Sequence, residues 1–130
     1  MKYRNLEHIE QKTLIEWADM QPLARYTFKA GKVGDFLFHI ANGGARSAVT
    51  GAILRSDGVR KGMLDLCFCL PNKNHHALYI EMKAPTKTAR VSKEQRCWID
   101  RLNEAGYLAC VAYGFSQAKE IIEKYLRNEV

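Results

Sequence analysis

Apolar residues near the start of the chain recur at the three- and four-residue spacing of a single helix face. The face is formed by Leu6, Ile9, Thr13, Leu14 and Trp17. This pattern predicts a helix over Leu6–Met20, with Asn5 as its N-cap and Pro22 just beyond its end.

Four later segments have the alternation or the apolar character of β-strands. They are Phe36–Ala41, Leu64–Leu70, Leu78–Lys83 and Tyr107–Tyr113. The second and third are separated by Pro71-Asn72-Lys73-Asn74, which is good turn chemistry and predicts an antiparallel hairpin.

Three further helices are expected between and after these strands. One runs over Ala45–Arg55 and ends at Ser56-Asp57-Gly58, where Gly58 can adopt the left-handed conformation. A second is opened by the capping box Ser92-Lys93-Glu94-Gln95 and ends near Ala105, and the last is capped by Ser116. The order α-β-α-β-β-α-β-α predicts an α/β fold with a mixed sheet and helices on both faces.

Composition sets limits on what such a domain can be. With 130 residues, 47% of them hydrophobic, the chain is expected to form a single domain over residues 1–130. It has no apolar run of the ~18–20 residues that cross a bilayer and no secretory signal, so we expect an intracellular, cytoplasmic protein, or one in the host cytoplasm if the gene is viral. A net charge of +6 favours a polyanionic partner.

The four cysteines are Cys67, Cys69, Cys97 and Cys110. They lie in apolar segments without a C-x-x-C pair, which favours reduced, buried thiols in an intracellular protein. The alternative is a zinc site built from Cys67 and Cys69 with His75 and His76, but this spacing matches no common structural zinc motif.

Two acids and a lysine on the predicted hairpin form the strongest chemical signal. Asp65 begins one strand and Glu81 lies near the end of its partner, so antiparallel pairing brings them together. Glu81 and Lys83 are two residues apart and share a face of the strand. Two carboxylates and an ammonium suit a Mg²⁺ or Mn²⁺ ion beside a phosphate ester. The alternative is a structural Asp–Lys–Glu salt-bridge cluster.

Several stretches resemble the VRR-NUC family of the PD-(D/E)xK nuclease superfamily. The quoted stretches are Glu7-His8-Ile9-Glu10-Gln11, Asn42-Gly43-Gly44, Gly58 to Leu66, Tyr79-Ile80-Glu81-Met82-Lys83, and Ser92 to Ile99. The likeness runs from about Glu7 to Leu126, nearly the whole chain. It implies a restriction-endonuclease-like three-layer core and metal-dependent phosphodiester hydrolysis. It also implies a homodimer acting on branched DNA such as four-way (Holliday) junctions, with Mg²⁺ or Mn²⁺ as cofactor.

The resemblance also assigns roles to residues. Asp65 and Glu81 match the metal-binding acids, and the backbone carbonyl of Met82 is a further expected metal ligand. Lys83 matches the motif lysine. A first-helix carboxylate completes many such sites, and both Glu7 and Glu10 match it; the alternative for both is a solvated helix face. Gln95 matches a glutamine that assists the site, beside its role in the capping box.

Candidates for DNA contact flank the active strands or the loops leading to them. They are Asn42, Arg46, Arg55, Arg60, Lys61, Lys87 and Arg90, each with a solvated surface position as its alternative. Backbone N–H groups of Asn42-Gly43-Gly44 before a helix can approach a phosphate, although an ordinary turn is the simpler interpretation.

One position departs from the family pattern. Leu64 stands where the family usually has proline before the aspartate; proline carries no catalytic group, so we expect the exchange to be tolerated. The exchange nevertheless keeps a second hypothesis open, a DNA-binding module that retains the fold without catalysis. A third hypothesis is a structural metal protein that uses the cysteines.

Overall fold

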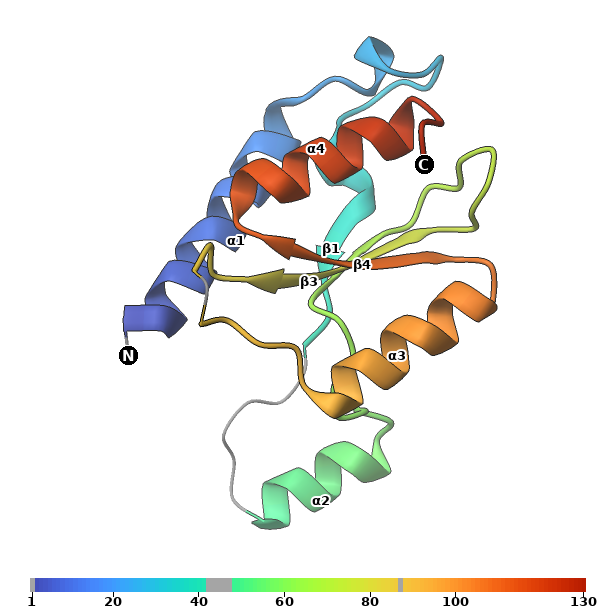
Figure 1. Cartoon of the computed structure of the whole chain (residues 1–130). Coiled ribbons are helices and arrows are strands. Elements are labelled where there is room, and N and C mark those ends of the chain that lie inside the picture. The colour runs from blue at the N-terminus through green and yellow to red at the C-terminus, as the bar shows by residue number, and fades with distance from the viewer. Residues whose placement is uncertain (1, 42–47, 87) are drawn as a thin grey trace.

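The computed structural model describes residues 2–41, 48–86 and 88–130 (Figure 1). The elements are α1 (Lys2–Met20), the 3-10 turns η1 (Leu23–Arg25) and η2 (Val33–Phe36), β1 (Leu37–His39), α2 (Ala48–Ser56), β2 (Leu66–Phe68), β3 (Leu78–Lys83), α3 (Lys93–Glu104), β4 (Leu108–Tyr113) and α4 (Phe115–Leu126). Apart from the two short turns, the predicted order of helices and strands is confirmed.

The four strands form one mixed sheet in the order β1-β2-β3-β4. β1 and β3 both pair antiparallel with β2, and β4 pairs parallel with β3. The predicted hairpin is therefore present, with Leu66 opposite Ile80 and Phe68 opposite Leu78.

Helices cover both faces of this sheet, as predicted for the α/β class (Figure 1). α1 and α4 pack against each other and against β3 on one face, where Leu14, Phe68, Ile80 and Tyr125 belong to the larger core. α3 packs on β4 on the other face, over a smaller core that contains the fully buried Leu64. The central strands β2 and β3 are the most buried, whereas β1 at the edge of the sheet is buried only at Leu37.

The capping box at the start of α3 is confirmed. Ser92 Oγ accepts the N–H of Gln95, and Gln95 Oε1 accepts the N–H of Ser92. At the other end Gly106, with a φ of 96°, follows the helix. Gly58, with a φ of 101°, likewise follows α2 in the left-handed conformation that was expected of it.

Two predicted helix starts are wrong. α1 begins at Lys2, so Asn5 lies inside the helix and is not its N-cap. α4 begins at Phe115 after Gly114, so Ser116 is a helical residue. The reason in the second case is a tertiary contact, because the Phe115 N–H donates to a carboxylate oxygen of Glu10 at 2.9 Å. A distant side chain thereby replaces the local serine cap.

Strand and helix limits also differ from the expectation in the middle of the chain. Phe36 belongs to the turn η2, and β1 contains only three residues. β2 is reduced to Leu66–Phe68. α2 begins at Ala48, and residues 45–47 of the predicted helix lie outside the described residues.

The cysteine expectation is half correct. Cys67 is buried and Cys110 is half-buried, but Cys69 and Cys97 are exposed, and all four are free thiols. In the described part of the chain these cysteines join no three-ligand group with His75 and His76, whose rings pack on Tyr125 and Tyr107 instead. The zinc alternative therefore loses its basis.

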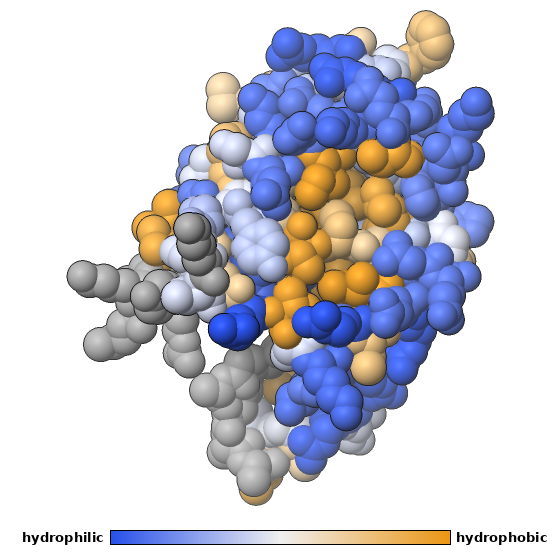
Figure 2. Space-filling model, viewed as in Figure 1, coloured by the Kyte–Doolittle hydropathy of each residue, from blue (hydrophilic) through white to orange (hydrophobic). Residues whose placement is uncertain are grey.

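The surface of the domain is mainly hydrophilic, with an apolar region on one face. In Figure 2 hydrophobic residues gather across the middle of the molecule, where Figure 1 places β4 between α3 and α4. β4 is an edge strand of the sheet, and its sequence Leu-Ala-Cys-Val-Ala-Tyr contains no charged residue. Among the described helices none has the length and apolar character needed to span a membrane.

Candidate active site

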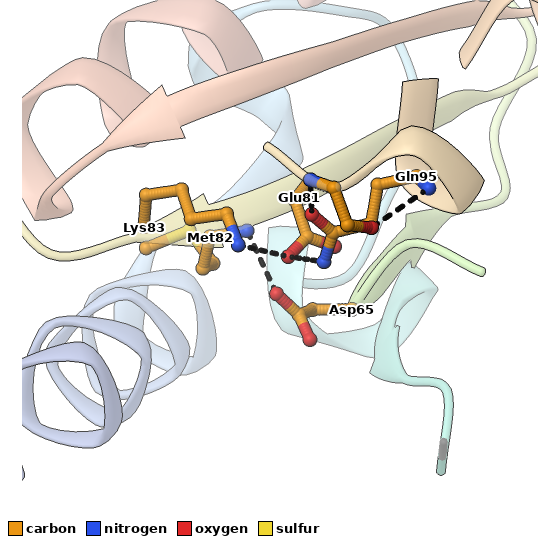
Figure 3. A network of polar contacts seen from close by, with 6 residues as sticks. Asp65, Glu81, Met82, Lys83 and Gln95 are labelled. Carbon is orange, nitrogen blue, oxygen red and sulfur yellow. Dashed lines mark hydrogen bonds and ion pairs between the residues drawn. The ribbon is translucent and has the colours of Figure 1, made fainter. Parts of the chain in front are cut away.

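The β2–β3 pairing brings two carboxylates together at one end of the hairpin. Because Leu66 lies opposite Ile80, Asp65 precedes β2 just where Glu81 follows Ile80 on β3. Asp65 is fixed further by its own contacts: its Oδ2 accepts the N–H of Met82 at 2.8 Å (Figure 3). Its backbone carbonyl accepts the N–H of Ile40 at 2.7 Å, which ties the same residue to the segment after β1.

Helix α1 supplies a third carboxylate. One carboxylate oxygen each from Glu7, Asp65 and Glu81 lies within 4.8 Å of the other two. Glu10, the other candidate on this helix, instead accepts the N–H of Phe115 and stabilises the start of α4. Of the two glutamates that the sequence could not separate, the structure thus places Glu7 in the acidic cluster and gives Glu10 a different contact.

Burial raises the pKa values of all three acids in the cluster. Burial, and after it the negative charge of Asp65, raises the pKa of Glu81 to about 8, although the Lys83 ammonium opposes this. Burial likewise raises the pKa of Asp65, against the hydrogen bond from Met82, and raises the pKa of Glu7 together with the charge of Asp65. Three neighbouring acids all resist ionisation, which is expected where like charges meet in a poorly solvated place.

Lys83 lies beside the carboxylates, as the two-residue spacing predicted. Its Nζ is 3.4 Å from Glu81 Oε2, and its side chain is only 13% exposed. The structural salt bridge considered from the sequence therefore exists between these two residues. It does not account for the convergence of Glu7 and Asp65 on the same carboxylate.

Gln95 holds Glu81 from the opposite side of the cluster. Its Nε2 donates to Glu81 Oε2 at 2.7 Å, while its Oε1 and backbone N–H complete the capping box with Ser92 (Figure 3). The two interpretations of Gln95 made from the sequence are thus compatible, and one side chain fulfils both.

The donor set fits a hard divalent cation. Glu81 is 2% exposed, yet its second oxygen, Oε1, is buried and has no hydrogen-bond partner in the described part of the chain. An unpaired buried carboxylate oxygen costs free energy unless a cation or proton satisfies it. Oxygen atoms from three carboxylates are the ligands that Mg²⁺ and Mn²⁺ prefer. The Met82 N–H donates to Asp65, and the Met82 carbonyl as a metal ligand stays a prediction.

One neighbour of the site was missed by the sequence analysis. His39, on β1, donates from Nδ1 to the backbone carbonyl of Asp65 at 2.9 Å, and it partly opposes the rise in the Asp65 pKa that burial causes. The register that places His39 opposite Leu66 brings the ring there. Pairing between strands separated by a helix leaves no local signal, so the pattern of the sequence could not have identified this contact.

The comparisons with known proteins agree with this geometry. The VRR-NUC domain family model matches residues 7–116. The chain belongs to the VRR-NUC family. A solved structure described as a VRR_NUC domain protein is similar to it, with a TM-score of 0.78 and 25% identity over 93% of this chain and 88% of that one. No curated protein matches the chain.

This VRR-NUC domain is nuclease-like, and its matched region contains all the residues of the acidic cluster. Leu64, where the resemblance led us to expect a proline, is fully buried in the core beneath α3 with Leu102 and Ala109. The leucine therefore has a packing role, and Asp65 beside it still reaches the cluster.

The predicted DNA-contacting residues fall into three groups. Arg90 lines a pocket of about 390 Å³ that opens beside the site and also contains Glu7, Lys83, Thr86 and Thr88. Farther along, Arg60 donates to the backbone carbonyl of Arg55 at 3.2 Å, and Lys61 forms an exposed ion pair with Glu94 at 3.4 Å. Asn42, Arg46 and Lys87 lie outside the described residues.

Proposed function

We propose that this VRR-NUC domain is a divalent-metal-dependent DNA endonuclease that cuts branched DNA such as four-way junctions. The observation that carries the proposal is the convergence of Glu7, Asp65 and Glu81 within 4.8 Å of one another. Beside them Lys83 supplies a positive charge 3.4 Å from Glu81, as a site for an anionic phosphate ester requires.

Glu7, Asp65 and Glu81 would hold the cation, which we propose to be Mg²⁺ or Mn²⁺. A bound divalent cation supplies Lewis-acid chemistry, polarising a phosphoryl oxygen and making a water molecule more acidic. The carboxylates must be ionised to bind it, and a cation lowers the pKa values that burial has raised.

The remaining residues orient the reactants. Lys83, on the same strand face as Glu81, is placed to stabilise the negative charge that develops on the phosphate or to position the attacking water. Gln95 fixes the Glu81 carboxylate by its 2.7 Å hydrogen bond, as outer partners of metal ligands commonly do. Arg90 lines the adjoining pocket, where its guanidinium group can contact the next phosphate of the DNA strand.

The net charge of +6 supports a nucleic-acid substrate through phosphate contacts. We base the proposed selectivity for branched DNA, and the proposed endonucleolytic cleavage, on the resemblance to the family. They make a clear prediction, since a junction should be cut more rapidly than a linear duplex of the same arm sequence.

We further propose that the domain acts as a homodimer, because symmetric cutting of a four-way junction needs two sites. β4 is a candidate for contact between protomers: it is an edge strand of six residues without a charge. Charged residues are a common means by which exposed edge strands avoid pairing. Light scattering of the purified protein should give twice the mass of 14.9 kDa at micromolar concentration, and a monomer throughout would refute this part.

The decisive experiment uses a labelled four-way junction and a matched linear duplex with Mg²⁺, Mn²⁺ or EDTA. We expect cutting of the junction only with a divalent cation, and no cutting by the Asp65→Asn variant. Activity that persists in EDTA would contradict metal dependence. Binding without cutting in both metals would support the alternative of a non-catalytic DNA-binding module.

A further inference from the structure

A second pocket lies on α3, apart from the acidic cluster. It has a volume of about 280 Å³ and is lined by Arg60, Lys61, Lys93, Glu94, Cys97, Trp98 and Arg101. This volume is just below the ~300–1,000 Å³ range of small-ligand pockets, so it suits a group no larger than a phosphate with its sugar.

The pocket is positively charged in excess. Lys61 pairs with Glu94 at 3.4 Å, which leaves Arg60, Lys93 and Arg101 without a carboxylate partner in the described part of the chain. All three are exposed at the surface. Three cations around one concavity repel one another, and an anion between them would relieve that repulsion.

One of these cations is already oriented. The guanidinium of Arg101 lies 4.6 Å from the centre of the Trp98 ring, and Trp98 itself packs against the small core beneath α3. A cation held on an aromatic face loses less side-chain freedom when it binds a phosphate. The half-buried tryptophan also lines the pocket.

The shape of the pocket depends on a glycine. The turn that carries Arg60 and Lys61 continues into Gly62, which has a φ of 83°. A Cβ on Gly62 would lie 2.5 Å from backbone and side-chain carbon atoms of Glu94. Only a residue without a side chain lets this turn approach the first turn of α3 so closely, and the approach brings the cations of both segments around one concavity.

The pocket and the acidic cluster share a helix turn. Glu94 lines the pocket, and its neighbour Gln95 donates to Glu81 in the cluster. The pocket and the cluster are therefore both contacted from the first turn of α3.

We infer that the pocket of Arg60, Lys93, Trp98 and Arg101 binds a phosphate group of the DNA substrate and anchors the strand beside the cleavage site. The inference rests on the proposed DNA substrate and extends it to residues of α3 that the sequence did not single out. The phosphate belongs either to the continuous backbone or to a strand end, and both have the same charge chemistry.

The test is equilibrium binding of a fluorescent four-way junction in EDTA, where the proposed cleavage cannot occur. Lys93→Gln combined with Arg101→Gln should weaken binding at least about tenfold and reduce the slope of log K against log salt by about two, since each phosphate contact contributes ~0.9. The matched control is Arg127→Gln, because Arg127 also covers an aromatic ring, that of Tyr26 at 5.4 Å, but follows α4 on the other face of the sheet. An equal loss of junction affinity in the double variant and in Arg127→Gln, or no loss of affinity in the double variant, would overturn the inference.

The exposed cysteines provide an independent measurement on the unaltered chain. Cys97 lines the pocket, whereas Cys69 is exposed at the end of β2 opposite to Asp65. At a free junction concentration about ten times Kd, labelling of Cys97 by a thiol reagent should slow about tenfold, because only the unbound fraction reacts. Cys69 should label at an unchanged rate, and an unprotected Cys97 would refute the inference.

The source of the phosphate is resolved by repeating the binding with 5′-phosphate and 5′-hydroxyl junctions. A loss in the double variant with both substrates assigns the pocket to the backbone, and a loss with the phosphorylated substrate alone assigns it to a strand end. Failure of the proposed nuclease function stays distinguishable, because it is read from cleavage in Mg²⁺ and Mn²⁺ and not from binding in EDTA.

Discussion

Gln95 Nε2 lies 2.7 Å from Glu81 Oε2, so the residue that closes the capping box of α3 also holds a carboxylate of the acidic cluster. The start of a helix and the geometry of the site are thereby linked through one side chain. This arrangement makes the two roles separable by substitution.

Ser92→Ala and Gln95→Ala should have similar effects on stability and different effects on activity. Each removes one half of the capping box and should lower the free energy of unfolding by about 1 kcal/mol. Only Gln95→Ala releases Glu81, so it alone should reduce cleavage by about 10–100-fold. Urea denaturation and single-turnover cleavage measure the two effects, and equal activity in both variants would exclude a positioning role for Gln95.

The two glutamates of α1 should also differ. Glu7→Ala removes a carboxylate from the cluster, so cleavage should fall at least about 100-fold while the folded state loses nothing, because a charge repulsion disappears. Glu10→Ala removes the acceptor of the Phe115 N–H and should cost about 1 kcal/mol of stability with cleavage retained. Loss of cleavage in Glu10→Ala at unchanged stability would reverse this assignment.

The acids of the site show which contacts the sequence can predict and which it cannot. The proximity of Asp65 and Glu81 follows from the hairpin, because the turn residues Pro71-Asn72-Lys73-Asn74 predict an antiparallel pair and period-two alternation predicts the faces. The choice between Glu7 and Glu10 depends on the rotation of α1 against the sheet. That rotation is set by packing of the whole core and has no local signal.

Errors at element ends have the same origin. Ser116 is a residue type that often caps helices, but α4 begins two residues earlier than a Ser116 cap predicts, at Phe115, whose N–H donates to the carboxylate of Glu10 from a helix distant in sequence. Helix α3 was predicted correctly at its start because both partners of its capping box lie within four residues. A capping box can be recognised from neighbouring residues, whereas the contacts of His39 and Glu10 join segments that are distant in sequence and form only in the folded chain.

In the absence of metal the stability of the protein should fall as pH rises from about 5 to 8. The folded Glu81 carboxyl has a pKa of about 8 against 4.5 for the free side chain, so the folded state keeps a proton that the unfolded chain has lost. The free energy of unfolding therefore decreases through this interval. Glu81→Gln should flatten the decrease and be more stable than the wild type at pH 8 in EDTA. An unchanged slope in this variant would show that Glu81 is not the responsible group.

Metal binding should reverse this trend. Because the carboxylates bind a cation only when ionised, Mn²⁺ or Mg²⁺ should raise Tm more at pH 8 than at pH 6. Differential scanning fluorimetry with and without EDTA measures the shift. Asp65→Asn should lose it, while Glu10→Ala should keep it, since Glu10 lies on the same helix as Glu7 but contacts Phe115. A shift that persists in Asp65→Asn would place the cation elsewhere.

Alanine substitutions at two glycines with similar backbone angles test whether the close approach of the turn before Asp65 to α3 matters for stability and cleavage. Gly58 and Gly62 have φ values of 101° and 83°, so alanine at either position should cost about 1–2 kcal/mol of stability in backbone strain. At Gly58 a Cβ meets nothing within 4 Å, whereas at Gly62 it would lie 2.5 Å from the Glu94 backbone and force the turn away from α3. Gly62→Ala should therefore be less stable than Gly58→Ala by a further ~1–3 kcal/mol.

Since the same turn leads directly into Asp65, Gly62→Ala should also cut more slowly even where it is fully folded. Equal stability and equal cleavage in the two variants would mean that the close approach of turn and helix matters neither for the fold nor for the site.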